Sequence, residues 1–142
     1  MATSFEEIYD LALITIQDYK LDYAYQNHQD IFYKRLKGLL IRSIPKFTGC
    51  LTSLEYDATS DSFIEELSSK EKNILADLTT ITWWDGVIND IRQVNLHISK
   101  NEFKVSTEAS NLKEKSERVD RLREKVRQDI TEYQLEADII SY

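Results

Sequence analysis

The chain has 142 residues, a length typical of one domain, and 42% of its residues are hydrophobic, which excludes wholesale disorder. It contains only three glycines and one proline, too few for the many turns of a strand-rich architecture. The formal net charge of -7 disfavours a role in coating DNA, because release of counterions from nucleic acid requires many bound cations. We therefore predict an all-α protein with a single helical domain over residues 1–142.

The first predicted helix spans residues 4–20. Ser4 and Glu7 are three residues apart, the spacing of a capping box, in which each side chain bonds a free N–H of the first helical turn. Apolar residues then recur every three or four positions from Phe5 to Tyr19, as expected for a helix that packs on a core. The polar stretch from Asp22 to Gln29 is predicted to be a connection.

A second helix is predicted for residues 30–47, with Asp30 as its cap. Pro45 has no N–H, so the helix either ends near Ser43 or kinks there. The periodicity changes after Thr48. Residues 51–66 allow a short β-hairpin between the second and third helices, although the segment lacks an Asn-Gly or Asp-Gly turn.

The third predicted helix, residues 68–97, is the most apolar. It opens with a second capping-box pair, Ser68 and Glu71. Gly86 inside it indicates close helix packing or a local bend. Trp83 and Trp84 point about 100° apart on a helix, so we expect at least one of them to meet a second surface.

The fourth and longest helix is predicted for residues 107–134, after a polar link from Ser99 to Ser106. Its apolar positions form a narrow seam of the coiled-coil kind, which includes Ser116 and Arg123. Residues 135–142 are predicted to be a tail, with more apolar surface than a frayed end usually has. Together the four helices predict a four-helix bundle-like domain with a long C-terminal helix.

No residue pattern supports catalysis, a cofactor or a metal site. The single cysteine, Cys50, excludes an internal disulfide and indicates a reducing cytosol. His28 and His97 are far apart and form no metal-binding pair. Residues 1–10 lack the features of a signal peptide, and no apolar run approaches the roughly 20 residues of a membrane span.

Two carboxylate patterns leave an enzyme as an alternative class. Some all-helical nucleotide pyrophosphohydrolases bind magnesium through paired acidic motifs, and Glu65 with Glu66 begins such a motif. However, the acid expected one turn later is missing. Glu117 and Asp120 are better explained as part of a solvated face with interleaved arginines. A cytosolic interaction module is the remaining alternative.

Three segments carry a family resemblance. They are SFEEIYDLALITIQDYKL at 4–21, SLEYD with SFIEELSSKEKNILADLTTITWW at 53–57 and 62–84, and STEASNLKEK at 106–115 and onward. The chain resembles the small structural proteins of the head-to-tail module of tailed bacteriophages, most closely in size and helical pattern the head-tail connector or adaptor proteins of the neck. Head-closure and tail-completion proteins of the same neck share the small size and stay as alternatives.

The resemblance implies a virion protein that is made in the host cytoplasm and contacts no membrane. It implies a homo-oligomeric ring, twelve-fold in the family, that binds the portal protein and other neck or tail proteins. DNA would pass through the ring transiently, without specific binding.

Two hypotheses about surfaces follow from physical argument. A ring subunit needs two different lateral surfaces, and this chain has more apolar faces than one small bundle must bury. We expect subunit or portal contacts from Trp83, Trp84, Leu135, Ile139, Ile140 and Tyr142. An acidic surface repels phosphate and lets a duplex slide. We expect the DNA conduit to be lined by Asp57, Asp61, Glu65 and Glu66.

Overall fold

The computed structural model describes the backbone of residues 2–15, 29–97 and 102–140, and the side chains of residues 2–14, 33–86, 88 and 113–136. Its elements, in chain order, are α1 (Phe5–Thr15), α3 (Gln29–Ser43), the 3-10 helix η1 (Ile44–Lys46), β1 (Tyr56–Asp57), β2 (Ser62–Phe63), α4 (Ser69–His97) and α5 (Glu102–Ile140). The expectation of a mostly helical protein is confirmed.

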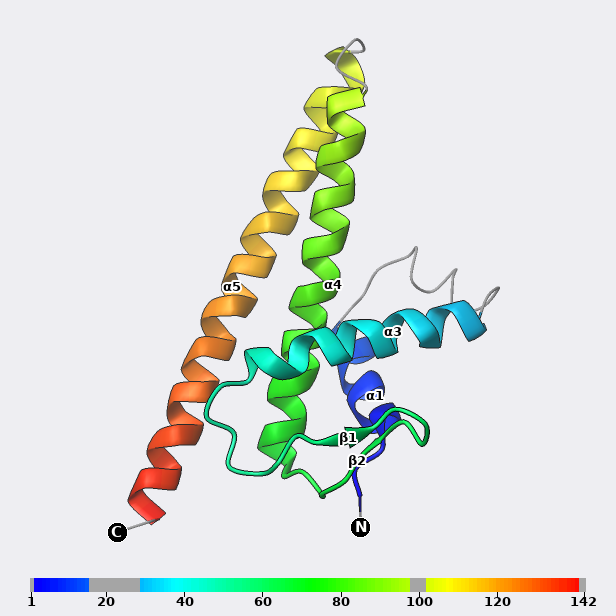
Figure 1. Ribbon diagram of the computed structural model, residues 1–142. Coiled ribbons are helices and arrows are strands. Elements are labelled where there is room, and N and C mark those ends of the chain that lie inside the picture. The colour runs from blue at the N-terminus through cyan, green and yellow to red at the C-terminus, as the bar shows by residue number, and fades with distance from the viewer. Residues whose placement is uncertain (1, 16–28, 98–101, 141–142) are drawn as a thin grey trace.

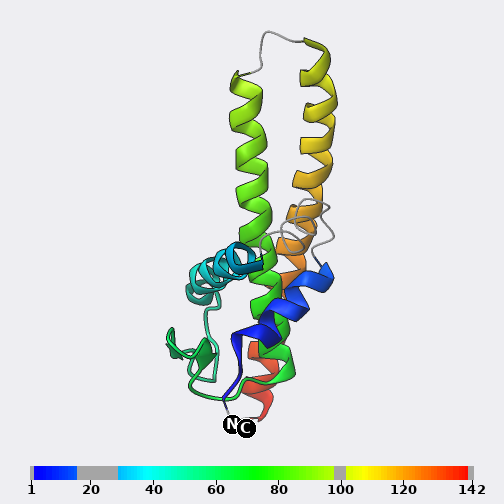
Figure 2. The ribbon, with the colours of Figure 1, turned by 90° about the vertical axis from the view of Figure 1, so that its right-hand side faces the viewer.

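Helix α4 is the centre of the arrangement, since α1, α3 and α5 all pack on it. Helices α4 and α5 run antiparallel as a long pair, and α1 and α3 cover only the half of α4 near the chain termini (Figures 1 and 2). The other half of the pair projects beyond them as an arm. Helix α3 crosses α4 at a steep angle (Figure 1). The predicted four-helix bundle is therefore not observed, because bundle helices run nearly parallel along their length.

The core lies where the four helices meet. Phe5, Ile8 and Ala12 of α1 are fully buried, as are Leu40 of α3 and Leu75 of α4. From α5 the buried residues are spaced by seven, which is the repeat of a coiled-coil seam. They are Val119, Val126 and Tyr133. The predicted narrow seam is confirmed for these positions, whereas Arg123 is exposed.

Both predicted capping boxes are present. The Ser4 N–H donates to Glu7 Oε2 at 3.2 Å, and Ser4 Oγ accepts from the Glu6 N–H at 3.1 Å. At the start of α4, the Ser68 N–H donates to Glu71 Oε1 at 2.8 Å, and the Glu71 N–H donates to Ser68 Oγ at 3.2 Å. These bonds satisfy N–H groups that the first turn of a helix leaves free.

The helix boundaries agree with expectation except in α5. Helix α4 starts one residue later than predicted, and α3 ends at Ser43, after which Pro45 lies in η1. The predicted span of 4–20 for the first helix, and the connection at 22–29, extend into residues 16–28, outside the described residues. Helix α5 is longer than predicted at both ends, because residues 102–140 contain no glycine or proline to interrupt it.

The predicted hairpin exists but is much shorter than residues 51–66. Strands β1 and β2 pair antiparallel, with Tyr56 opposite Phe63. Instead of an Asn-Gly turn, Asp57 Oδ1 accepts from the Thr59 N–H at 2.9 Å, and Asp61 adopts a positive φ of 52°. The Phe63 N–H donates to the Thr3 carbonyl at 2.8 Å, so the hairpin is fixed to the start of α1.

We predict that Leu75→Ala lowers the free energy of unfolding by about 2–5 kcal/mol, because it leaves a cavity on the helix that all the others contact. Leu51→Ala is the matched control, since Leu51 is 71% exposed. Urea denaturation of both variants measures the difference. Equal destabilisation by the two substitutions would contradict the position of α4 at the centre of the core.

Candidate functional site

A buried carboxylate joins three distant parts of the chain. Glu71, on the first turn of α4, is 2% exposed. Its Oε2 accepts from the Tyr133 hydroxyl of α5 at 2.6 Å, and its Oε1 accepts from the Thr52 hydroxyl at 2.9 Å and from the Ser68 N–H. The Cys50 thiol donates to Oε2 at 3.4 Å. We call Glu71, Tyr133, Cys50, Thr52 and Ser68 the Glu71 cluster.

The cluster keeps the carboxylate ionised without a cation. Burial by itself raises the pKa of Glu71, but the hydrogen bonds from Tyr133, Ser68, Thr52 and Cys50 outweigh it and hold this pKa at about 2. Its position on the first turn of α4 adds the favourable field of the helix N-terminus. A buried charge is thus stabilised by neutral donors, which is sufficient when every oxygen is bonded.

The same environment keeps the neighbouring thiol of Cys50 and phenol of Tyr133 protonated. Burial and the charge of Glu71 raise the pKa of the Cys50 thiol to about 11, and burial with the bond to Glu71 raises the pKa of Tyr133. Both groups therefore stay protonated near neutral pH, the form in which each donates a hydrogen bond to Glu71. Tyr133 Oη also accepts from the Leu51 N–H at 2.9 Å, so the cluster fastens the loop at 50–52 and the end of α5 to α4.

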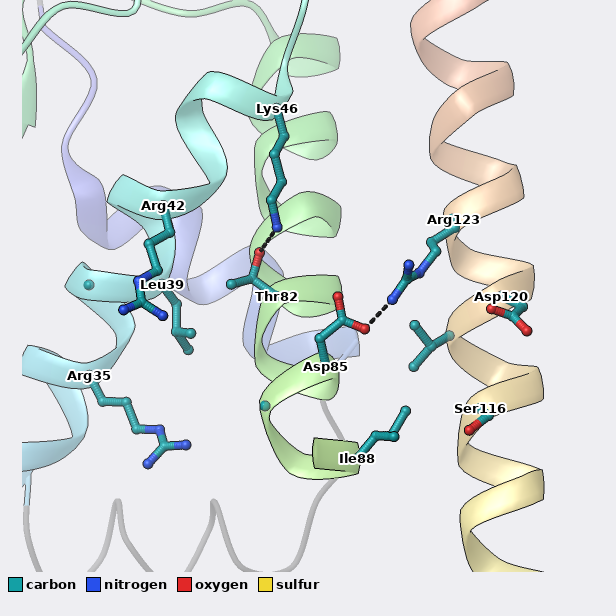
Figure 3. A pocket seen from close by; sticks show the side chains of 13 residues that line it. Arg35, Leu39, Arg42, Lys46, Thr82, Asp85, Ile88, Ser116, Asp120 and Arg123 are labelled. Atoms are coloured by element: carbon teal, nitrogen blue, oxygen red, sulfur yellow. Dashed lines mark hydrogen bonds and ion pairs between the residues drawn. The ribbon is translucent and has the colours of Figure 1, made fainter. Parts of the chain in front are cut away.

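A large groove lies between α3, α4 and α5. Its volume is about 1000 Å³, and its lining includes four cationic, two carboxylate and three apolar side chains (Figure 3); we call the apolar ones its floor. The floor contains Leu39, Ile88 and Val119. The charged lining consists of Arg35, Arg42, Lys46, Asp85, Asp120 and Arg123. We call this feature the basic groove.

Two of the four cations are used inside the chain and two are not. Arg123 pairs with Asp85, and Lys46 Nζ donates to Thr82 Oγ1 at 3.1 Å (Figure 3). Arg35 and Arg42 are exposed and have no hydrogen-bond or ion-pair partner among the described residues. An acidic protein thus holds two unpaired arginines beside one groove, which favours an anionic ligand or partner there.

The groove was not predicted from the sequence, although the basic residues that line it form a visible cluster. Residues 31–54 contain five basic residues and no acidic one, in a chain of net charge -7.

The expectation for Gly86 was also wrong in one respect. A Cβ at Gly86 or at Gly38 would meet nothing within 4 Å, so neither glycine marks close packing. Both line the groove instead and leave its walls open.

The predicted interface residues whose side chains the structure describes differ in exposure. Trp83 and Trp84 are only 4% and 7% exposed, and their rings contact edge to face with centroids 4.8 Å apart. The second surface that they meet is therefore within the chain itself, where α1, α3 and α5 all pack on α4. Their contact with a partner stays a prediction. Leu135, by contrast, is 55% exposed. Ile139 and Ile140 belong to α5 but their side chains lie outside the described residues, as does Tyr142.

The predicted conduit residues are all exposed but have unequal surroundings. Asp61 pairs with Lys37 of α3 at 2.6 Å. Asp57 caps its own turn, and the hydrogen bond from the Thr59 N–H lowers its pKa. Glu65 and Glu66 follow β2 on the surface. Of the four predicted conduit residues, these two glutamates alone have no ion pair or turn contact within the described residues. They are therefore the stronger candidates for an acidic lining.

In residues 2–15, 29–97 and 102–140, no three histidine, cysteine or acidic side chains gather as a metal site. Within the same ranges no helix is long and apolar enough to cross a membrane. Comparisons of the chain with protein-family models, curated proteins and solved structures found no match.

We predict that Glu71→Gln lowers the free energy of unfolding by about 2 kcal/mol at pH 7, because the amide cannot accept all the donors that face it. The pKa of Glu71 is about 2 when folded against 4.5 ordinarily, so the folded state binds fewer protons. Its contribution to stability is therefore complete above pH 4.5 and is lost as the pH falls toward 2.

Chemical denaturation between pH 2 and 7 measures this difference. The stability of Glu71→Gln should depend less on pH below 4.5 than that of the unmodified protein. Glu66→Gln, at an exposed position, is the control and should follow the unmodified protein. Parallel pH profiles for all three would show that the Glu71 cluster does not hold an ionised carboxylate.

The burial of both tryptophans gives a second prediction. Because they are the only tryptophans, intrinsic fluorescence reports on them alone. We expect iodide to quench this fluorescence weakly, and to the same extent in the dissociated and in the assembled protein. A clear loss of quenching on assembly would show that assembly covers at least one of the tryptophans.

Proposed function

We propose that the chain is a structural subunit of the neck of a tailed bacteriophage, a head-tail connector that forms a ring between the portal and the tail. The observation that carries the proposal is the unequal distribution of unpartnered groups over the surface. Two unpaired arginines, Arg35 and Arg42, line the basic groove, whereas the exposed Leu135 and the unpaired Glu132 lie toward the C-terminal end of α5. Two dissimilar surfaces on one subunit are what a ring built from head-to-tail contacts requires.

The shape of the molecule supports the same function. The arm of α4 and α5 extends well beyond α1 and α3 (Figure 2). Such an arm exposes two sides to neighbouring molecules, while the end near the termini is fixed by the Glu71 cluster and the hairpin. A subunit of this form can contact neighbours along its length and offer its base or its tip to a different protein.

The surface charge agrees with a place beside DNA. Glu65 and Glu66 are exposed and unpaired within the described residues, and the whole chain has a net charge of -7. In a conduit, such carboxylates repel the phosphate backbone, so a duplex moves past without being held. In the proposed ring these residues line the lumen and DNA passes in transit.

The experiment is a deletion of the gene from a phage that carries it, with complementation by the unmodified gene. We expect the deletion to yield DNA-filled heads and separate tails, and complementation to restore joined particles that contain the protein, as measured by mass spectrometry and electron microscopy. Averaged images of the neck then distinguish a connector from a head-closure or tail-completion protein.

Two results would overturn the proposal. One is the absence of the protein from purified particles, which would favour a cytosolic interaction module. The other is a thermal shift with magnesium and a nucleotide, followed by hydrolysis of that nucleotide, which would favour an enzyme.

A further inference from the structure

The basic groove has the composition of a receptor for an acidic helix. Arg35, Arg42 and Lys46 follow one another along α3 and η1, and all three line the groove. The apolar floor is made by Leu39 of α3, Ile88 of α4 and Val119 of α5. A helix that inserts an apolar side chain and carries acidic residues on either side would match both features.

The size of the groove agrees with this occupant. A volume of about 1000 Å³ is far more than a single phosphate or carboxylate fills. Gly38 and Gly86 line it without side chains, and a Cβ at either would meet nothing within 4 Å. Room for a bulky apolar group is therefore present beside the free arginines.

The end of α5 has the complementary composition. Residues 128–142 contain four acidic residues and no basic one. Leu135 is 55% exposed, Glu132 is exposed and unpaired within the described residues, and Glu136 pairs only with the exposed Lys70. The negative end of the helix dipole adds to the charge of these carboxylates.

We propose that the basic groove of one copy receives the C-terminal turns of α5 from a second copy. The same chain cannot fill its own groove. The part of α5 that lines the groove ends at Arg123, and Leu135 lies twelve residues further along the helix, about 18 Å away at 1.5 Å per residue. The complementary surfaces of a single chain therefore point to different neighbours.

Such a contact is heterologous, since a groove always meets a helix end and never another groove. Repeated from copy to copy, it generates a closed ring or an open filament. The inference deepens the proposed function by naming the contact that would build the ring, yet it requires only self-association and is testable without a phage.

Duplex DNA is the competing anion. The apolar floor has no counterpart on the charged phosphate backbone of a duplex. An acidic helix, by contrast, can place an apolar side chain on the floor and its carboxylates beside Arg35 and Arg42. These features favour a protein helix over a nucleic acid.

Paired charge reversals test the contact on the full-length purified protein. The groove variant is Arg35→Glu with Arg42→Glu, and the tail variant is Glu132→Lys with Glu136→Lys. All four positions are exposed, so both variants should keep the helical circular dichroism spectrum. A matched control, Lys113→Glu with Arg127→Glu, makes the same charge change at exposed positions outside the groove.

Sedimentation velocity over a range of concentrations and salt gives the readout. The unmodified protein and the control should associate, more strongly at low salt. The groove variant alone and the tail variant alone should each associate at least about tenfold more weakly, because like charges then meet. An equimolar mixture should recover association, since each variant offers the other a complementary pair.

Three results would overturn the inference: an unmodified protein that stays monomeric at all concentrations, association that the reversals leave unchanged, or a mixture that does not recover. Binding of duplex DNA that only the groove variant loses would assign the groove to nucleic acid instead. The proposed function can fail separately, because it depends on the presence of the protein in phage particles.

Discussion

The burial of α4 on several sides at once is the constraint on which the rest of the structure depends. Helices α1, α3 and α5 each pack mainly on α4 rather than on one another. A helix with three neighbours must be apolar on most of its circumference, and α4 meets this demand with a run from Ile74 to Ile81 in which every side chain is buried. The polar members of that run, Asp77, Thr79 and Thr80, are all bonded, the threonines to carbonyls one turn back and Asp77 to Lys125.

This constraint explains which expectations held. The capping boxes at Ser4 and Ser68 and the bounds of α4 were predictable, because they depend on local spacing that tertiary packing does not alter. The burial of both tryptophans was not predictable, for the opposite reason. Two adjacent side chains on a helix do diverge, but a sequence does not state how many neighbours surround that helix. With three neighbours, both directions lead into the core.

The ends of α5 and the basic groove were not predicted from the sequence, for another physical reason. Polar composition suggested a link from Ser99 to Ser106, and residues 135–142 were predicted to be a tail. Residues 102–140 nevertheless form one helix, because no glycine or proline interrupts it and Tyr133 is bonded to Glu71. The groove combines residues from α3, α4 and α5. Its basic side was visible in the sequence, but its depth, its apolar floor and its two open glycines exist only after α3 crosses α4.

The buried carboxylate of Glu71 and the exposed guanidinium groups of Arg35 and Arg42 differ in how their charge is balanced. The buried charge of Glu71 is satisfied by hydroxyl, thiol and N–H donors, although the chain has eighteen basic residues that could have been placed beside it. Conversely, Arg35 and Arg42 neutralise no acid within the described residues and contribute no ion pair to folding. Unpaired cations at the edge of an apolar groove repel one another and gain nothing within the isolated chain. An anionic partner would give them a favourable contact, and the C-terminal turns of α5, with Glu132 and Glu136, carry charge of the matching sign.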